Sequence, residues 1–225
     1  MINNVKFLKI PDTCPVCGGK TEIRQENDSK ILVCTNPNCS GKLLSRFSHF
    51  VSKPAMNIDG LSEASLEKFI DKGWIKTFAD IYHLDEHKSE IVNMDGFGKK
   101  SYDKMWLAIQ NSREVKLENF LVSLGVSNIG KTASKTISKY FDGDWKKFIL
   151  SFPHNFNWTT LDDFGDVIAK SLNNYFCDLN NREEWKPLLD EVTFIKPQQT
   201  ISIDNATMPS SPFTGKRIYC TGSFA

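Results

Sequence analysis

Apolar residues recur at intervals of three and four positions in four segments of the chain, the spacing that places side chains on one face of an α-helix. These segments carry Leu66, Phe69 and Ile70; Met105, Trp106 and Ile109; Ala133, Ile137, Tyr140 and Phe141; and Ile168, Leu172, Tyr175 and Phe176. A short polar turn precedes each segment. Another apolar run of the same period, at 117–124, comes before the third turn. The pattern predicts a mostly α fold in which similar tight turns join the helices.

The four turns share one pattern and recur at similar intervals along the chain. They read Asp59-Gly60-Leu61-Ser62, Asp95-Gly96-Phe97-Gly98, Ser127-Asn128-Ile129-Gly130 and Asp162-Asp163-Phe164-Gly165. We expect the apolar residue in each turn to anchor it in the core. A helix, a tight hairpin with glycine and a second helix form a helix-hairpin-helix unit, so the sequence predicts a tandem array of such units.

The chemistry of these hairpins points to nucleic acid. Glycines let the turn approach a sugar-phosphate backbone, and the free amides at the start of the next helix can receive a phosphate oxygen. Such contacts position a protein on DNA without reading its sequence. The candidate DNA-binding residues are Gly60, Leu61, Ser62, Gly96, Phe97, Gly98, Lys99, Lys100, Asn128, Ile129, Gly130, Lys131, Lys135 and Gly165.

The distribution of charge along the chain indicates which hairpins contribute most to DNA binding. The formal net charge is only +1, but residues 96–150 are rich in lysine and 151–195 are rich in acidic residues. Lys131, Lys135 and Lys139 recur every four positions behind the third hairpin, either as phosphate contacts or as an ordinary solvated helix face. The fourth hairpin carries Asp162 and Asp163, which would repel phosphate. We expect the second and third hairpins to dominate DNA binding and the fourth mainly to pack.

Four of the six cysteines form a C-x2-C-x16-C-x4-C pattern. Cys14, Cys17, Cys34 and Cys39 can complete the tetrahedral four-sulfur shell that a structural zinc ion accepts, with short strands between the two pairs. The alternative is a pair of disulfides or unrelated buried thiols. Cys177 and Cys220 have no partner at metal spacing, so we expect them to be small core residues.

Composition changes this picture little. With 225 residues, 40% of them hydrophobic and 24% charged, the chain has the composition of a folded protein and not of a disordered one. No apolar run reaches the length of a membrane helix, and no secretory signal is evident at the N-terminus. We therefore expect a cytoplasmic protein with no membrane partner.

The order of the motifs resembles one family closely. CPVCGGK, VCTNPNCSGKL, RFSHFVSKPAMNIDGL, MDGFGKKS, FLVSLGVSNIGKTAS and GKRIYCTGSF together are similar to the C-terminal part of bacterial-type NAD-dependent DNA ligases. The resemblance implies the exit of an absent OB-fold at 1–10, a four-cysteine zinc finger at 11–45 and a helix-hairpin-helix domain at 46–195. A linker at 196–214 and a truncated BRCT start at 215–225 would follow. The implied fold is thus mostly α, with a zinc ribbon in front and a BRCT-like stub behind.

The resemblance also implies a role. In the family this region grips nicked double-stranded DNA for strand joining in replication and repair. The family's adenylated lysine lies in a K-x-D-G motif that this sequence lacks, so no catalytic residue is expected here. NAD and Mg²⁺ would act only through the missing catalytic part. If the enzyme is split, the partner is a chain with the adenylation and OB domains, and this chain alone is expected to be inactive.

Two other interpretations stay open at this point. The chain could be a stand-alone, non-catalytic adaptor that binds nicked or branched DNA through the same hairpins. A weaker alternative is a protein interaction module in which the finger and the repeats only form a scaffold.

Overall fold

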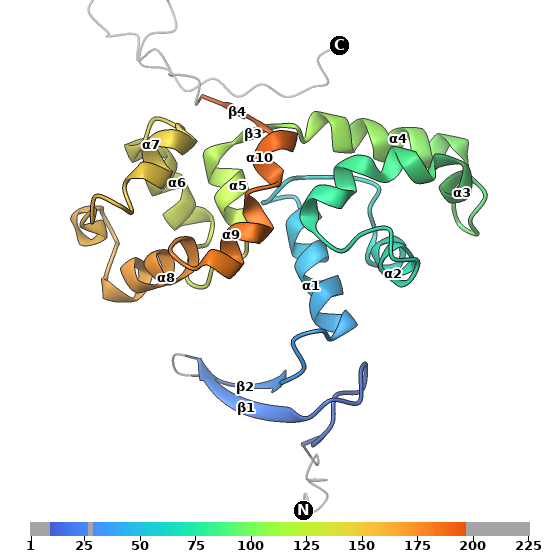
Figure 1. Ribbon diagram of the computed structural model, residues 1–225, viewed down its shortest axis with the longest axis horizontal. Coiled ribbons are helices and arrows are strands. Elements are labelled where there is room, and N and C mark those ends of the chain that lie inside the picture. The colour runs from blue at the N-terminus through green and yellow to red at the C-terminus, as the bar shows by residue number, and fades with distance from the viewer. Residues whose placement is uncertain (1–9, 27–28, 197–225) are drawn as a thin grey trace, which may run out of the picture.

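The computed structural model describes residues 10–26 and 29–196 of the chain. A two-stranded ribbon comes first, and a helical body follows it (Figure 1). Strands β1 (Thr21–Glu26) and β2 (Ser29–Cys34) pair antiparallel, with Thr21 opposite Cys34. The predicted strands between the cysteine pairs are confirmed. The structure does not describe residues 1–9 of the expected OB-fold exit (1–10), residues 197–214 of the expected linker (196–214), the BRCT-like stub or Cys220.

The ribbon is connected to the helical body by α1 (Ser40–Val51). In Figure 1 this helix runs from the end of β2 into the centre of the body, away from the ribbon. Its last turns bury Phe47, Phe50 and Val51 in the core. One helix therefore has one end at the cysteines and the other end in the apolar core.

The rest of the described chain is mostly helical, as the apolar period predicts. Its elements are α2 (Glu63–Asp71), η1 (Phe78–His87), α3 (Lys88–Val92), α4 (Lys99–Asn111), β3 (Glu114–Lys116), α5 (Leu117–Ser123), α6 (Lys131–Tyr140), α7 (Trp145–Leu150), η2 (Trp158–Thr160), α8 (Asp166–Phe176), α9 (Leu179–Trp185), α10 (Leu188–Glu191) and β4 (Thr193–Ile195). Helices α2 to α4 lie on one side of α1 in Figure 1, and α6 to α8 lie on the other. A continuous aromatic and aliphatic core joins the two sides.

A short parallel pair of strands closes the second half of the body. β3 pairs with β4, Val115 lying opposite Phe194. The Phe194 ring stacks on Trp145 and meets Phe120 edge-on. The segment that contains the third and fourth hairpins therefore begins and ends at the same place in the fold.

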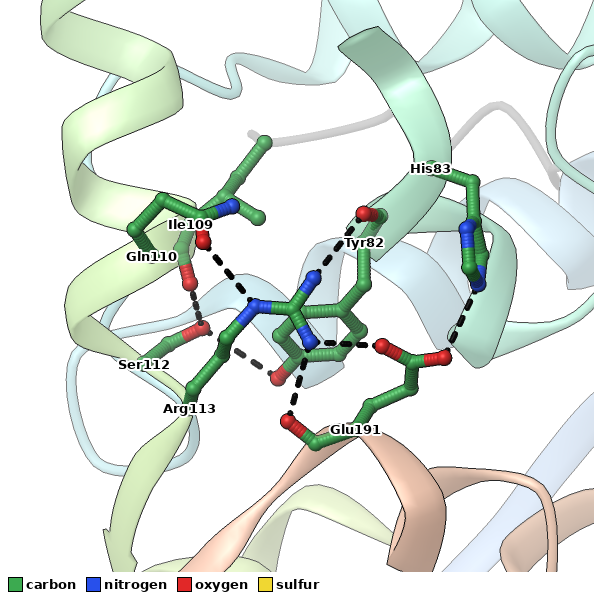
Figure 2. A network of polar contacts seen from close by, with 7 residues as sticks. All are labelled: Tyr82, His83, Ile109, Gln110, Ser112, Arg113 and Glu191. Atoms are coloured by element: carbon green, nitrogen blue, oxygen red, sulfur yellow. Dashed lines mark hydrogen bonds and ion pairs between the residues drawn. The ribbon is translucent and has the colours of Figure 1, made fainter. Parts of the chain in front are cut away.

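A polar network joins α10 to η1 and to the end of α4 (Figure 2). The Arg113 guanidinium donates from Nη1 to Glu191 Oε2 at 2.6 Å and from Nη2 to the Tyr82 carbonyl oxygen at 3.1 Å. Glu191 also contacts His83 Nε2 at 2.9 Å. Ser112 Oγ donates to the Tyr82 hydroxyl at 3.2 Å. One arginine thus connects α4, η1 and α10.

Of two sequence-based expectations about the core, one is confirmed and the other is wrong. The apolar anchors are confirmed: Leu61, Ile129 and Phe164 are buried, and the half-buried Phe97 packs against the core. The expectation that Cys177 is a core residue is wrong, because Cys177 follows α8 and is exposed.

Among the residues that the structure describes, no helix combines the length and the apolar character needed to cross a bilayer.

Candidate metal centre and nucleic-acid interface

The four cysteines converge at the junction of the ribbon and α1. All four Sγ atoms lie within 4.8 Å of one another. Cys14 Sγ is 3.9 Å from Cys39 Sγ, and Cys17 Sγ is 3.5 Å from Cys34 Sγ. A disulfide needs about 2.0 Å, so the disulfide alternative is wrong for these pairs. A tetrahedral four-thiolate zinc site with bonds of about 2.3 Å has sulfur-to-sulfur edges of about 3.8 Å, close to these two distances.

Tight turns bring the cysteines to this point. Gly18 has φ +67°, and the Cys14 N–H donates to the Gly19 carbonyl at 2.7 Å. A Cβ on Gly19 would lie 3.1 Å from Asn36 Cβ and 3.2 Å from Cys17 Sγ, so the two cysteine turns meet closely there. Cys39 is the N-cap residue of α1. The turn residues thus pack one pair of thiols against the other.

The thiols of the cluster differ in acidity. The backbone hydrogen bond of Gly19, followed by the Asn36 side chain, lowers the pKa of Cys17 to about 6. Backbone hydrogen bonds from Cys17 and Val16 also lower the pKa of Cys14. Burial raises the pKa of Cys34 to about 11. A cation bound by all four would stabilise the thiolate of Cys34 as well, because metal ligation deprotonates a coordinating thiol.

All four hairpin tips adopt the same backbone path. The second residue of each four-residue turn has positive φ, at Gly60 (93°), Gly96 (84°), Asn128 (64°) and Asp163 (64°). An apolar residue follows, and then an extended N-cap residue opens α2, α4, α6 or α8. Asn and Asp are the side chains that tolerate this conformation best after glycine. The structure therefore brings the predicted hairpin residues into four copies of one turn.

The tips pack in two pairs. Gly60 of the first tip lies against α4, where an added Cβ would be 3.2 Å from Met105 Cα. Lys68 Nζ on α2 donates to the Asp95 carbonyl beside the second tip at 2.8 Å. In the second pair, Asn128 of the third tip contacts Ser171 on α8. Within each pair a tip therefore packs against the helix that follows the other tip.

The helix starts behind the tips differ in their free amides and their charge. Ser62 Oγ accepts a hydrogen bond from Ser65 N at 3.2 Å, so the first tip caps its own helix. The other three helices begin after glycine with no side-chain cap. Lys99 and Lys100 open α4 and Lys131 opens α6, whereas Glu63 and Asp166 open α2 and α8. The second and third tips alone combine uncapped amides with a basic first turn.

The sequence patterns did not identify one lysine that lies beside the third tip. Lys53, in the turn between α1 and α2, lines a hollow with Lys131 and Lys135 on α6. Lys53 has no periodic partner, and 78 residues separate it from Lys131. The only local signal is a lysine before Pro54 in an otherwise apolar stretch, which does not identify a binding residue.

Known proteins resemble this chain over most of its length. It is 44% identical over 191 residues to a DNA ligase of Lachnoclostridium phytofermentans, a match that covers 85% of this chain and 29% of that protein. A DNA ligase of Ruminiclostridium cellulolyticum is 41% identical over 81% of this chain and 28% of its own length. A DNA ligase of Fusobacterium nucleatum is 30% identical over 98% and 31%. The chain thus spans less than a third of these relatives, and no protein-family model matches it.

Proposed function

Because this chain is homologous to one region of the DNA ligases, we propose that it grips nicked double-stranded DNA for strand joining in replication and repair. The observation that carries the proposal is the pair of uncapped, basic helix starts behind the second and third tips. Backbone N–H groups at a helix start and nearby lysines together favour a phosphate oxygen. Phosphate contacts position a protein without reading sequence, which suits an enzyme that acts on any nick.

In this proposal the four hairpins contribute unequally to DNA binding. The second and third tips supply the main phosphate contacts through their amides and through Lys99, Lys100 and Lys131. The first tip contributes less, since Ser62 already occupies one amide at the start of α2. The fourth tip mainly packs, because Asp163 and Asp166 face any approaching phosphate with negative charge.

The metal centre is part of the same proposal. A zinc ion held by Cys14, Cys17, Cys34 and Cys39 fits the sulfur distances and leaves no open coordination position. Its role is structural: it would stabilise the ribbon at the start of α1. Removing the metal would therefore disorder the ribbon without removing a catalytic group.

The chemistry of sealing is assigned to another part of the ligase. No K-x-D-G tetrapeptide occurs in this sequence, so the adenylated lysine, NAD and Mg²⁺ would belong to a region or chain with the adenylation and OB domains. We place the assembled enzyme in the cytoplasm. Adding a cognate adenylation and OB chain is expected to give NAD-dependent sealing, and failure with a chain that does adenylate itself would contradict the link to ligation.

The DNA-binding role itself is tested with the zinc-loaded chain and two duplexes of identical sequence, one nicked and one intact. Affinity is measured at several salt concentrations, because phosphate contacts release counterions and give a steep salt dependence. We expect salt-dependent binding that favours the nicked duplex. A folded, zinc-loaded chain that binds neither duplex would overturn the proposal.

A further inference from the structure

A basic hollow lies beside the third hairpin. Its lining residues are Lys53, Pro54, Glu118, Asn119, Val122, Lys131 and Lys135, and its volume is about 360 Å³. They come from the turn after α1, from α5 and from α6, which are far apart in the sequence. Three lysines and a single glutamate give this surface an excess of positive charge. A hollow of this size with three lysines at its edge suits an anionic group.

The lysines of the hollow are available for a ligand. Lys53, Lys131 and Lys135 are exposed. Among the described residues, the ion pairs involve other cations, and none joins one of these three lysines to Glu118. Three like charges that share one hollow with a single carboxylate repel one another, and a bound anion would relieve that repulsion.

The Lys53 backbone is held in place although its side chain is free. Asn119 Nδ2 on α5 donates to the Pro54 carbonyl at 3.0 Å. The Ala55 and Asn57 amides both donate to the Ser52 carbonyl, at 3.0 and 2.9 Å. Ala55, within this turn, is buried. The turn therefore presents Lys53 to the hollow from a fixed position, which lowers the entropy lost when a ligand binds.

The hollow continues the surface of the third tip. Lys131 is the first residue of α6, directly behind Gly130, and Lys135 lies one turn further along the same helix. A second hollow of about 280 Å³ shares Lys53 and Asn119 with the first and adds Lys116 and Glu114. The basic surface thus runs from the third tip past Lys135 and Lys53 toward Lys116.

We propose that this hollow is a second phosphate-binding site, which holds the sugar-phosphate backbone of duplex DNA one step beyond the third tip, with Lys53 as its main contact. The inference rests on the proposed function and extends it to a residue outside the hairpins. Two consecutive contacts on one strand would fix the direction in which the duplex leaves the tip. A single contact would let the duplex rotate about that point.

The test compares Lys53→Gln with a matched control in the full zinc-loaded chain. Lys186→Gln removes the same charge from an exposed lysine after α9, outside both hollows. Affinity for nicked duplex DNA is measured between 50 and 300 mM salt, roughly the range in which phosphate contacts dominate. We expect Lys53→Gln to weaken binding about five- to tenfold near 100 mM salt and to reduce the salt slope by about one. Lys53→Arg should keep the wild-type slope.

Each outcome decides between the two proposals. If wild-type chain binds and Lys53→Gln keeps both the affinity and the salt slope, the second site is wrong while the hairpin function stands. An equal loss in Lys53→Gln and Lys186→Gln would also overturn it, since the effect would then come from net charge alone. If the wild-type chain binds no duplex, both proposals fail. Circular dichroism establishes that the variants are folded, as expected for exposed side chains.

Discussion

Asn128 Nδ2 donates a hydrogen bond to Ser171 Oγ at 3.0 Å, joining the third hairpin tip to the helix behind the fourth. Asn128 therefore has two roles: it adopts the positive φ of the tip and it ties the two hairpins of its pair together. In the first pair the corresponding position is Gly60, which makes close backbone contact with α4 instead. An asparagine side chain thus replaces a backbone contact in the second pair.

Asn128→Val should destabilise the protein, and Asn128→Gly should not do so to the same degree. A β-branched residue at φ 64° is strained, with a cost of about 1 to 3 kcal/mol. Glycine accepts this conformation and loses only the bond to Ser171, worth about 1 kcal/mol. Denaturant unfolding of both variants measures the difference. Equal losses would mean that the hydrogen bond and not the backbone conformation decides stability at this tip.

Reversing the charge of Lys99 and Lys100 should weaken DNA binding far more than Asp163→Gly strengthens it. The lysines open α4 behind an uncapped glycine, whereas Asp163 belongs to a tip whose helix still begins with Asp166. We expect a loss of at least tenfold for Lys99→Glu with Lys100→Glu, roughly the effect of two lost phosphate contacts and the added repulsion. Fluorescence anisotropy with labelled nicked duplex compares the two changes. Changes of similar size would contradict the ranking of the hairpins.

Cys17→Ser should abolish tight metal binding, and Cys177→Ser should leave it unchanged. Cys17 supplies one of four clustered thiols, whereas Cys177 is exposed on its own after α8. The metal content of purified protein, measured by mass spectrometry, is expected to be one zinc per wild-type chain and close to none for Cys17→Ser. The helical circular dichroism of Cys17→Ser should persist, because α1 enters the core through its last turns, at the end away from the cysteines. A full metal content in Cys17→Ser would contradict the four-cysteine site.

Arg113→Met should destabilise the protein by about 2 to 4 kcal/mol, because it leaves the largely buried Glu191 carboxylate with only His83 beside it. Adding Glu191→Gln should restore part of the loss, which a double-mutant cycle measures directly. The exposed pair Lys147–Asp142 serves as the control. Its cycle should give less than about 1 kcal/mol, as for other surface pairs. A coupling no larger for Arg113 than for Lys147 would show that the network in Figure 2 adds little stability.

The protein should lose stability between about pH 10 and 12. Burial raises the pKa of Tyr82 to about 12 in the folded chain, above its ordinary value of 10. Below pH 10 both states keep the proton and the contribution is complete. Above pH 10 the unfolded chain ionises first, so the free energy of unfolding falls, by about 2 kcal/mol for this group. Tyr82→Phe should make the fall shallower, whereas Tyr140→Phe, at an exposed ring, should leave it unchanged. Parallel curves for wild type and Tyr82→Phe would exclude this role.

Local patterns predicted most of the helical framework and the metal cluster. The three-and-four apolar spacing and the glycine turns are local signals, because a helix and its N-cap depend on residues within a few positions. The cysteine spacing is equally local, since each pair lies in one turn. The finding of positive φ at Asn128 and Asp163 shows why residues other than glycine could keep the hairpin pattern.

Features that depend on distant residues were not predicted. Strands β3 and β4 have three residues each, too few to show an alternating pattern, and they lie 79 positions apart. Arg113 and Glu191 are separated by 78 positions, so nothing near either one indicates the other. The same holds for Lys53 and Lys131. The residue type of Cys177 predicts a core position, but its place after the last turn of α8 exposes it.

The parallel pairing of β3 with β4 makes the intervening segment a closed loop in the chain. Since this segment starts and ends at one point, the strand pair, the shared core and the Arg113–Glu191 contact together hold it against the first pair of hairpins. Opening of the second half would therefore require all three to break, and the strand pair is the tie between its two ends. Hydrogen exchange would register such opening as a group of amides in α5 to α8 that exchange at one common rate.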